Sequence, residues 1–330
     1  LHDNHSRIYG LNQGATKEIR ENPKELKKFK ESEIFNGYPK PNIDLDSLRA
    51  SLNSKEHHEI EGIYMKEDFL TIGVYRNENE NNYEAIIFDS KVDLWEAGEV
   101  MSTLTPYGNE YLLSVGGSLS SKRLIAYTER IEKGFFFFMG FQKDTTQSNY
   151  SIEMPSEATY FREEVTDEIT YLRIGSFSSW YPALSDAERF YEGLRGNLKT
   201  SKLIVDLRNN GGGGDRNSDI LFKILKKYAK NNAVYVLINH RTISNAEQFA
   251  YRLSQLRNCQ LFGMRTNGTL AYEIKGESFK LPCGNFTAVL SSKAHKRYTA
   301  FESKGIEPSV TFDMESNWLE QLKTYIENND

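Results

Sequence analysis

The sequence predicts an α/β protein: a mostly parallel sheet with flanking helices, joined to a separate all-β module. Two observations carry this prediction. From about residue 166 onward, apolar strands alternate with amphipathic helices, which is typical of a parallel sheet covered by helices. Between about residues 60 and 143, short apolar runs recur at roughly 8–12-residue spacing, which is typical of a small barrel or sandwich.

Composition excludes several classes of protein. The chain has 330 residues, a net charge of −5 and a pI of about 5.8. Because it is acidic, its charge does not indicate nucleic-acid binding. No apolar run approaches the ~18 residues of a membrane-spanning helix. Two cysteines, Cys259 and Cys283, leave both pairing and compartment open. No CxxC or HExxH spacing indicates a metal, and no cofactor is predicted.

Changes in composition divide the chain into three parts. Residues 1–54 are polar and predict loops with short helices, and residues 55–150 predict the β module. Residues 151–330 predict the α/β domain. The chain opens at Leu1 without an initiator Met, so the lack of a targeting sequence carries no information about location.

The β module begins with "IEGIYMKEDFLTIGVYRNENENNYEAIIFDSK", in which apolar and polar residues alternate and "NENENN" forms a turn between two strands. Further predicted strands are "YLLSVG", "RLIAYTERI" and "GFFFFMGF". Trp95, in "VDLWEAGEV" with Gly98, is interpreted as a core residue in preference to a ligand contact.

In the α/β domain, periodicity predicts a strand at 169–177 and a helix at 184–194, where Ser185 and Glu188 have capping-box spacing. A continuous apolar strand, "KLIVDL", follows. The remaining predicted elements are a helix at 219–228, a strand at 233–239, a helix at 246–256, the strand "QLFG" and a helix at 317–328.

Four glycines follow a predicted buried strand in "LIVDLRNNGGGG", which runs from Leu203 to Gly214. Free backbone N–H groups at such a junction can hold an anion. The GxxxxGK[ST] phosphate pattern is absent, and GxGxxG fails because residue 216 is Arg. An oxyanion hole and a plain flexible connection both stay open.

Ser244 lies at a second strand–turn–helix junction, "VLINHRTISNAEQF". With Glu247 it has the spacing of a capping box, and most serines at such positions are only caps. A nucleophilic serine needs a base within reach and an acid that orients the base. Six histidines, at positions 2, 5, 57, 58, 240 and 295, could supply the base, and spacing alone does not choose among them.

Together, "KLIVDLRNNGGG" and "TISNAEQFAYRL" resemble the DLRxNxGG loop and TxSxAE turn of the tail-specific (C-terminal processing) serine peptidase family. "LFGMRTNGTL" is similar to the family's GxRTxG segment, and "FESKGIEPSV" to its closing E-x-x-G-[IV]-x-P-D segment. The resemblance covers roughly residues 166–330 and the first few residues. It implies a crotonase/Clp-protease-like fold.

The family has two catalytic designs. One branch places a Lys where this chain has Thr269, so a Ser–Lys dyad is not expected. "LHDNHS" resembles the D-G-H-T-like motif of the other branch, which includes the tricorn core protease and retinoid-binding-protein repeats. The resemblance implies Ser244 as nucleophile, His5 as general base and Glu302 as the orienting acid. It also implies an oxyanion hole from the N–H groups of Gly212 and Asn245, with Gly211 and Gly213 as further candidates.

The implied function is a serine endopeptidase that hydrolyses peptide bonds through a Ser-His-Glu acyl-enzyme mechanism, without metal or cofactor. Its partner is a peptide or protein substrate, and the family implies a periplasmic or secreted location, with anchoring through a preceding segment as a variant. Asn245, Ser309 and the lack of a PDZ carboxylate loop in 60–143 depart from the family pattern. Two alternatives stay open: an inactive member that binds peptides or hydrophobic ligands, and a crotonase-like acyl-thioester enzyme.

Overall fold

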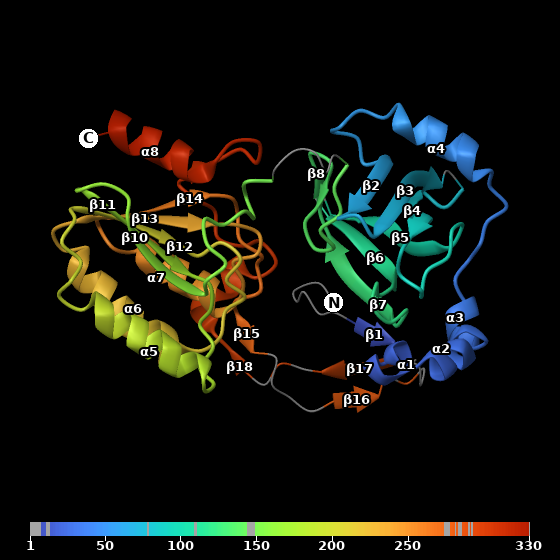
Figure 1. Cartoon of the computed structure of the whole chain (residues 1–330), viewed down its shortest axis with the longest axis horizontal. Helices are drawn as coiled ribbons and strands as arrows, with labels where there is room; N and C mark the ends of the chain where they lie inside the picture. The colour runs from blue at the N-terminus through green and yellow to red at the C-terminus, as the bar shows by residue number, and fades with distance from the viewer. Residues whose placement is uncertain are drawn as a thin grey trace. The chain divides into compact units, whose positions relative to one another are not determined.

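The computed structural model describes residues 8–10, 14–77, 79–108, 111–143, 149–273, 278–280, 282, 286–289, 291 and 293–329. They form two compact units (Figure 1). The α/β unit contains the described residues of Gln147–Lys275 and Ser291–Asp330, and the β unit those of His5–Thr146 and Gly276–Leu290.

A six-stranded sheet forms the centre of the α/β unit, in the order β10-β11-β12-β13-β14-β19. Strand β10 is antiparallel to β11, and the other neighbours are parallel. The predicted α/β class with a mostly parallel sheet is therefore confirmed. The strands are β10 Tyr160–Glu164, β11 Ile169–Ile174, β12 Lys202–Asp206, β13 Ala233–Ile238, β14 Cys259–Gly263 and β19 Val310–Thr311.

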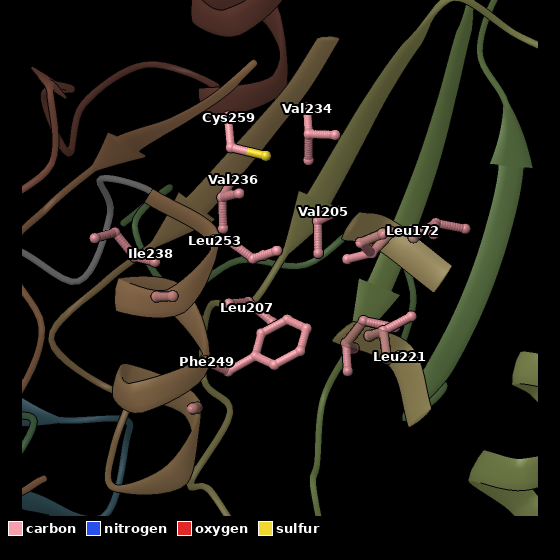
Figure 2. Close-up of a cluster of buried hydrophobic side chains, with 14 of the residues drawn as sticks. Leu172, Val205, Leu207, Leu221, Val234, Val236, Ile238, Phe249, Leu253 and Cys259 are labelled. Atoms are coloured by element: carbon pink, nitrogen blue, oxygen red, sulfur yellow. The ribbon is translucent and has the colours of Figure 1, made fainter. Parts of the chain in front are cut away.

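Helices cover both faces of this sheet because its strands are apolar on both sides. Leu203 and Val205 of β12 pack with side chains of helices α5, α6 and α7, whereas Ile204 packs with α8. Figure 2 shows the first of these clusters, in which α6 and α7 contribute Leu221, Phe249 and Leu253. The helices are α5 Ala183–Leu194, α6 Asp215–Tyr228, α7 Asn245–Ser254 and α8 Trp318–Asn328, with a 3-10 helix, η1, at Lys296–Phe301.

Two local features of this unit bear on the sequence predictions. The prediction of a capping box at Ser185 and Glu188 is wrong, because α5 begins at Ala183 after Pro182 and Ser185 lies inside the helix. Cys259 is buried with a free thiol, and burial raises the pKa of that thiol to about 12. Cys283, its predicted possible partner, lies outside the described residues.

The β unit contains a nine-stranded antiparallel sheet in the order β16-β17-β1-β7-β6-β5-β4-β3-β2. Among the described strands the sheet is open, with β16 and β2 at its edges, so the barrel, one of the two predicted alternatives for this module, does not form. The strands are β1 Ile8–Gly10, β2 Gly62–Lys66, β3 Leu70–Asn77, β4 Asn82–Ser90, β5 Val100–Tyr107, β6 Tyr111–Gly117, β7 Leu124–Glu129, β16 Ser278–Lys280 and β17 Phe286–Val289.

Shorter elements complete the described chain. The β unit also contains a small hairpin, β8 Ile131–Glu132 with β9 Phe135–Phe136, and helices α1 Lys17–Glu21, α2 Pro23–Lys30, α3 Glu33–Asn36 and α4 Leu45–Asn53. The α/β unit contains a second small hairpin, β15 Tyr272–Glu273 with β18 Lys293–Ala294.

A buried ion pair fastens helix α3 to the sheet of the β unit. Lys122 Nζ lies 2.6 Å from Glu99 Oε1 and donates to the carbonyl oxygen of Phe35 at 3.0 Å. The ammonium group also lies 3.8 Å from the ring centroid of Phe35 and 4.8 Å from that of Trp95. Trp95 is only 3% exposed, which confirms its predicted core position.

We expect Lys122→Met to lower the free energy of unfolding by about 3–5 kcal/mol, because it leaves the Glu99 carboxylate buried without its cation. Lys122→Met with Glu99→Leu removes both charges and should recover most of that loss. Urea unfolding of the two variants and the parent measures both effects. A double variant as unstable as the single one would contradict this account of the pair.

Candidate active site

Ser244 stands in a strained backbone conformation at the turn between β13 and α7. Its φ is 58° and its ψ is −122°, outside the regions that side-chain-bearing residues normally occupy. An N-cap serine normally has an extended backbone, so the capping function alone does not explain this geometry. Such strain costs on the order of 1–3 kcal/mol and gathers at functional sites.

The carboxylate of Glu247 holds this turn in place from inside the protein. Glu247 is fully buried, and its Oε2 accepts the N–H of Ser244 at 2.8 Å and that of Thr269 at 3.0 Å. Its Oε1 accepts the Thr266 hydroxyl at 2.7 Å and the Gly268 N–H at 2.6 Å. One carboxylate thus joins the serine turn to the loop at 266–269.

The glycine turn after β12 touches the serine turn directly. Gly212 has a φ of +90°, and a Cβ there would lie 3.0 Å from both Ser244 Cβ and the Asn245 nitrogen. Gly213 has a φ of +149°, and its Cβ would lie 1.9 Å from the Phe177 carbonyl oxygen. These two positions therefore require glycine, whereas a Cβ on Gly211 would meet open space.

Asn210 connects the two turns to the end of β11. Its Nδ2 donates to the Ile174 carbonyl oxygen at 2.9 Å, and its Oδ1 accepts the Gly212 N–H at 2.9 Å. Its own carbonyl oxygen accepts the N–H of Ile243, directly before the serine, at 2.9 Å. The Gly212 N–H therefore already donates a hydrogen bond within the protein.

Other N–H groups at the junction are not used in this way. Within the described chain, the N–H groups of Gly211, Gly213 and Asn245 make no hydrogen bond. Asn245 is the first residue of α7, where the helix dipole favours negative charge. Its side chain donates to Asp215 Oδ1 at 2.8 Å, at the start of α6.

The DLR portion of the glycine motif has a structural role. Arg208 and Asp206 form a buried ion pair, with Nη2 2.6 Å from Oδ2. Asp206 also accepts the Tyr171 hydroxyl at 2.8 Å, and Arg208 donates to the Tyr150 carbonyl oxygen at 2.8 Å. These contacts fix the end of β12, from which the glycine turn starts.

Glu302 follows η1 and binds the same loop as Glu247. Its Oε2 accepts the N–H groups of Leu270 at 3.0 Å and Ala271 at 2.7 Å. Half-burial raises the pKa of Glu302, and the two N–H groups oppose that shift. Its Oε1 makes no hydrogen bond with the described part of the chain.

The structure thus brings together three of the predicted site residues, Gly212, Ser244 and Asn245. It places Glu302 against the neighbouring loop at 266–271, whose Leu270 and Ala271 N–H groups it binds. His5 lies outside the described residues. Sequence reasoning missed Asn210 and the wider role of Glu247, although the second Asn of "DLRNNGGG" and the Glu of "TISNAEQF" both belong to the motifs.

A serine on a sharp strand-to-helix turn beside free backbone N–H groups is typical of hydrolases with a serine nucleophile. The family model described as "Peptidase family S41" matches residues 168–227 and 216–312. The match covers residues 168–312, so this part of the chain is similar to peptidase family S41, in agreement with the tail-specific family predicted from its motifs.

Solved structures of similar proteins have low sequence identity to the chain. A lipoprotein from Streptococcus agalactiae is 19% identical, over 52% of this chain and 70% of that one, with a TM-score of 0.36. A photosystem II D1 C-terminal processing protease is 14% identical over 93% and 92%, with a TM-score of 0.33. A putative S41 protease from Bacteroides fragilis is 12% identical over 89% and 94%, with a TM-score of 0.36. No functionally curated protein matches the chain in sequence.

Two features are absent from the described residues. None of the described helices combines the length and apolar character needed to cross a membrane. No group of three or more His, Cys, Asp or Glu side chains in the described ranges is arranged to hold a metal ion.

Burial raises the pKa of Glu247 to about 7, from 4.5, and its four hydrogen-bond donors oppose this shift only in part. The folded protein therefore binds this proton more tightly than the unfolded chain. The stability that this bound proton contributes is fully present below pH 4.5 and is lost as the pH rises through 7. Between pH 5 and 8, the parent should lose roughly 3 kcal/mol of unfolding free energy relative to Glu247→Gln. Urea unfolding across this range measures the difference, and parallel pH profiles would contradict it.

Gly212→Ala should lower the free energy of unfolding by about 1–3 kcal/mol, because alanine is strained at this φ and its methyl group would meet the Ile243 carbonyl oxygen at 2.7 Å. Gly211→Ala is the matched control and should change stability by less than about 0.5 kcal/mol. Denaturant unfolding compares the pair, and equal losses would refute the close approach at Gly212.

Proposed function

We propose that this chain is a serine endopeptidase in which Ser244 is the nucleophile, His5 the general base and Glu302 the acid that orients His5. The observation that carries the proposal is the contact between the strained Ser244 turn and the glycine turn, with the Asn245 N–H beside them. The S41 family match supports a peptidase role, and the motif resemblance supports the three residue assignments.

In the proposed reaction, Ser244 Oγ attacks the carbonyl carbon of a peptide bond while His5 accepts the hydroxyl proton. The carbonyl oxygen becomes an oxyanion, and the carbon–nitrogen bond then breaks as His5 gives its proton to the leaving amine. Water attacks the acyl-enzyme by the same route and releases the acid. Glu302 Oε1 is available for the imidazole, because only Oε2 binds the 270–271 backbone.

We assign the oxyanion hole to the N–H of Asn245 and to an N–H of the exposed glycines, Gly211 or Gly213. Gly212, the donor expected from the motif, already donates its N–H to Asn210 Oδ1. In this proposal Gly212 serves close packing against the serine turn. Each hole donor typically contributes ~3 kcal/mol to transition-state stabilisation.

The proposed substrate is a peptide or protein, and we propose a periplasmic or secreted location because the family resemblance implies one. Neither assignment rests on the low-identity structures.

A fluorophosphonate probe tests the mechanism, because it bonds covalently to an activated serine. We expect the parent to be labelled, Ser244→Ala to lose labelling, and His5→Ala to be labelled roughly 10³-fold more slowly. Ser254→Ala, at the other end of α7, is the matched control and should label like the parent. Labelling that survives Ser244→Ala would overturn the nucleophile assignment. An unlabelled parent would favour the inactive, ligand-binding alternative.

A further inference from the structure

Two neighbouring aromatic side chains stay exposed on the loop between β11 and α5. Trp180 is 82% exposed and Tyr181 is 63% exposed. They are the large apolar side chains that remain exposed in the described α/β unit, since the other three, Leu113, Val115 and Phe279, belong to the β unit. Single exposed apolar residues are ordinary, but an adjacent aromatic pair next to a candidate site indicates an interaction surface.

Hydrogen bonds fasten this loop to the glycine turn. The Phe177 N–H donates to the Gly212 carbonyl oxygen at 2.9 Å, and the Gly214 N–H donates to the Phe177 carbonyl oxygen at 2.9 Å. The Ser179 hydroxyl donates to the Gly214 carbonyl oxygen at 3.1 Å. The exposed pair therefore begins one residue beyond a segment bonded to the candidate oxyanion turn.

The beginning of α6 holds the loop from a second direction. Buried Asn217 donates from Nδ2 to the Ser178 carbonyl oxygen at 2.8 Å. Arg216 donates from Nη2 to the Tyr181 hydroxyl at 3.0 Å, and its guanidinium carbon lies 5.5 Å from the Tyr181 ring centroid. Rigid aromatic side chains lose little conformational entropy when a partner covers them, so they are efficient anchors for binding.

We propose that Trp180 and Tyr181 form a platform that receives an apolar side chain of the peptide substrate, close to the bond that is cleaved. This inference rests on the proposed peptidase function, because the platform is defined by its continuity with the glycine turn. Its apolar faces gain most from an aliphatic or aromatic side chain. Arg216, a cation in contact with Tyr181, is already engaged with that side chain, so an acidic side chain gains less.

The test uses two acetylated hexapeptide amides, Lys-Ala-Leu-Leu-Ala-Lys and Lys-Ala-Ser-Ser-Ala-Lys, with the full chain. We expect the leucine peptide to be cleaved with a kcat/KM about 30-fold above that of the serine peptide. Trp180→Ala should remove most of this preference, and Trp180→Phe should keep it. Arg189→Ala, which truncates an exposed side chain of α5, is the surface control and should behave like the parent.

A second readout does not depend on hydrolysis. Trp180 is exposed, whereas Trp95 is 3% and Trp318 is 1% exposed, so covering the platform should shift the tryptophan emission to shorter wavelength. In Ser244→Ala, the leucine peptide should produce this shift and the serine peptide should not. Adding Trp180→Phe to that variant should abolish the shift, which would show that Trp180 reports the binding.

The outcomes separate the two proposals. An emission shift without fluorophosphonate labelling or cleavage would keep the platform and overturn the peptidase mechanism. Normal labelling with an unchanged leucine preference in Trp180→Ala would overturn the platform and keep the mechanism. No shift and no preference would also overturn the platform. Dissociation of a dimer by Trp180→Ala, with kcat/KM unchanged, would identify the pair as a contact between two copies of the chain.

Discussion

The geometry of the candidate site depends on the carboxylate of Glu247. The backbone of Ser244 is strained, and the hydrogen bond that its N–H donates to Glu247 offsets part of that strain. The same group also binds the loop at 266–269, so the serine turn and the loop cannot shift independently. Glu247 lies in the first turn of α7, where the helix dipole favours a negative charge.

The four glycines at 211–214 are needed for different physical reasons. Gly212 and Gly213 lie where the backbone of one turn meets the backbone of another, and a Cβ would displace main-chain atoms. A Cβ on Gly214 would meet the Ser179 side chain at 2.8 Å, which a rotamer change could relieve, and Gly211 has no such neighbour. The run therefore combines two close approaches with a stretch that leaves N–H groups accessible.

Local patterns predicted strands β11 to β14 and helices α5 to α8, because short stretches of sequence are enough to show a continuous apolar strand such as β12 or an amphipathic helix such as α7. The capping box predicted for α5 was wrong because Ser185 and Glu188 have capping-box spacing but lie inside the helix. Closure of the β sheet was also beyond local reasoning. Its edges, β2 and β16, come from segments more than 200 residues apart, and nothing in either segment specifies the other.

The site could be predicted only in part, for a similar reason. Motifs located Ser244, Gly212 and Asn245 because short turns carry them, and the structure brings these residues together. The partners of Glu247 were not predictable from its capping-box spacing. Thr266 and Gly268 lie about twenty residues further along the chain, and only the packing of that loop against α7 brings them to the carboxylate.

The two carboxylates of the site differ in the lone pairs that they leave available. Each oxygen of Glu247 accepts two close hydrogen bonds from the surrounding chain, so this carboxylate has little capacity to orient a base. Glu302 directs both of its backbone contacts to Oε2, which leaves Oε1 for an imidazole N–H. Thr269, the position where one family branch has a lysine, donates its N–H to Glu247. In the proposed mechanism, the base for Ser244 therefore comes from another segment, and Glu302 is the carboxylate of this pair with an oxygen left to orient it.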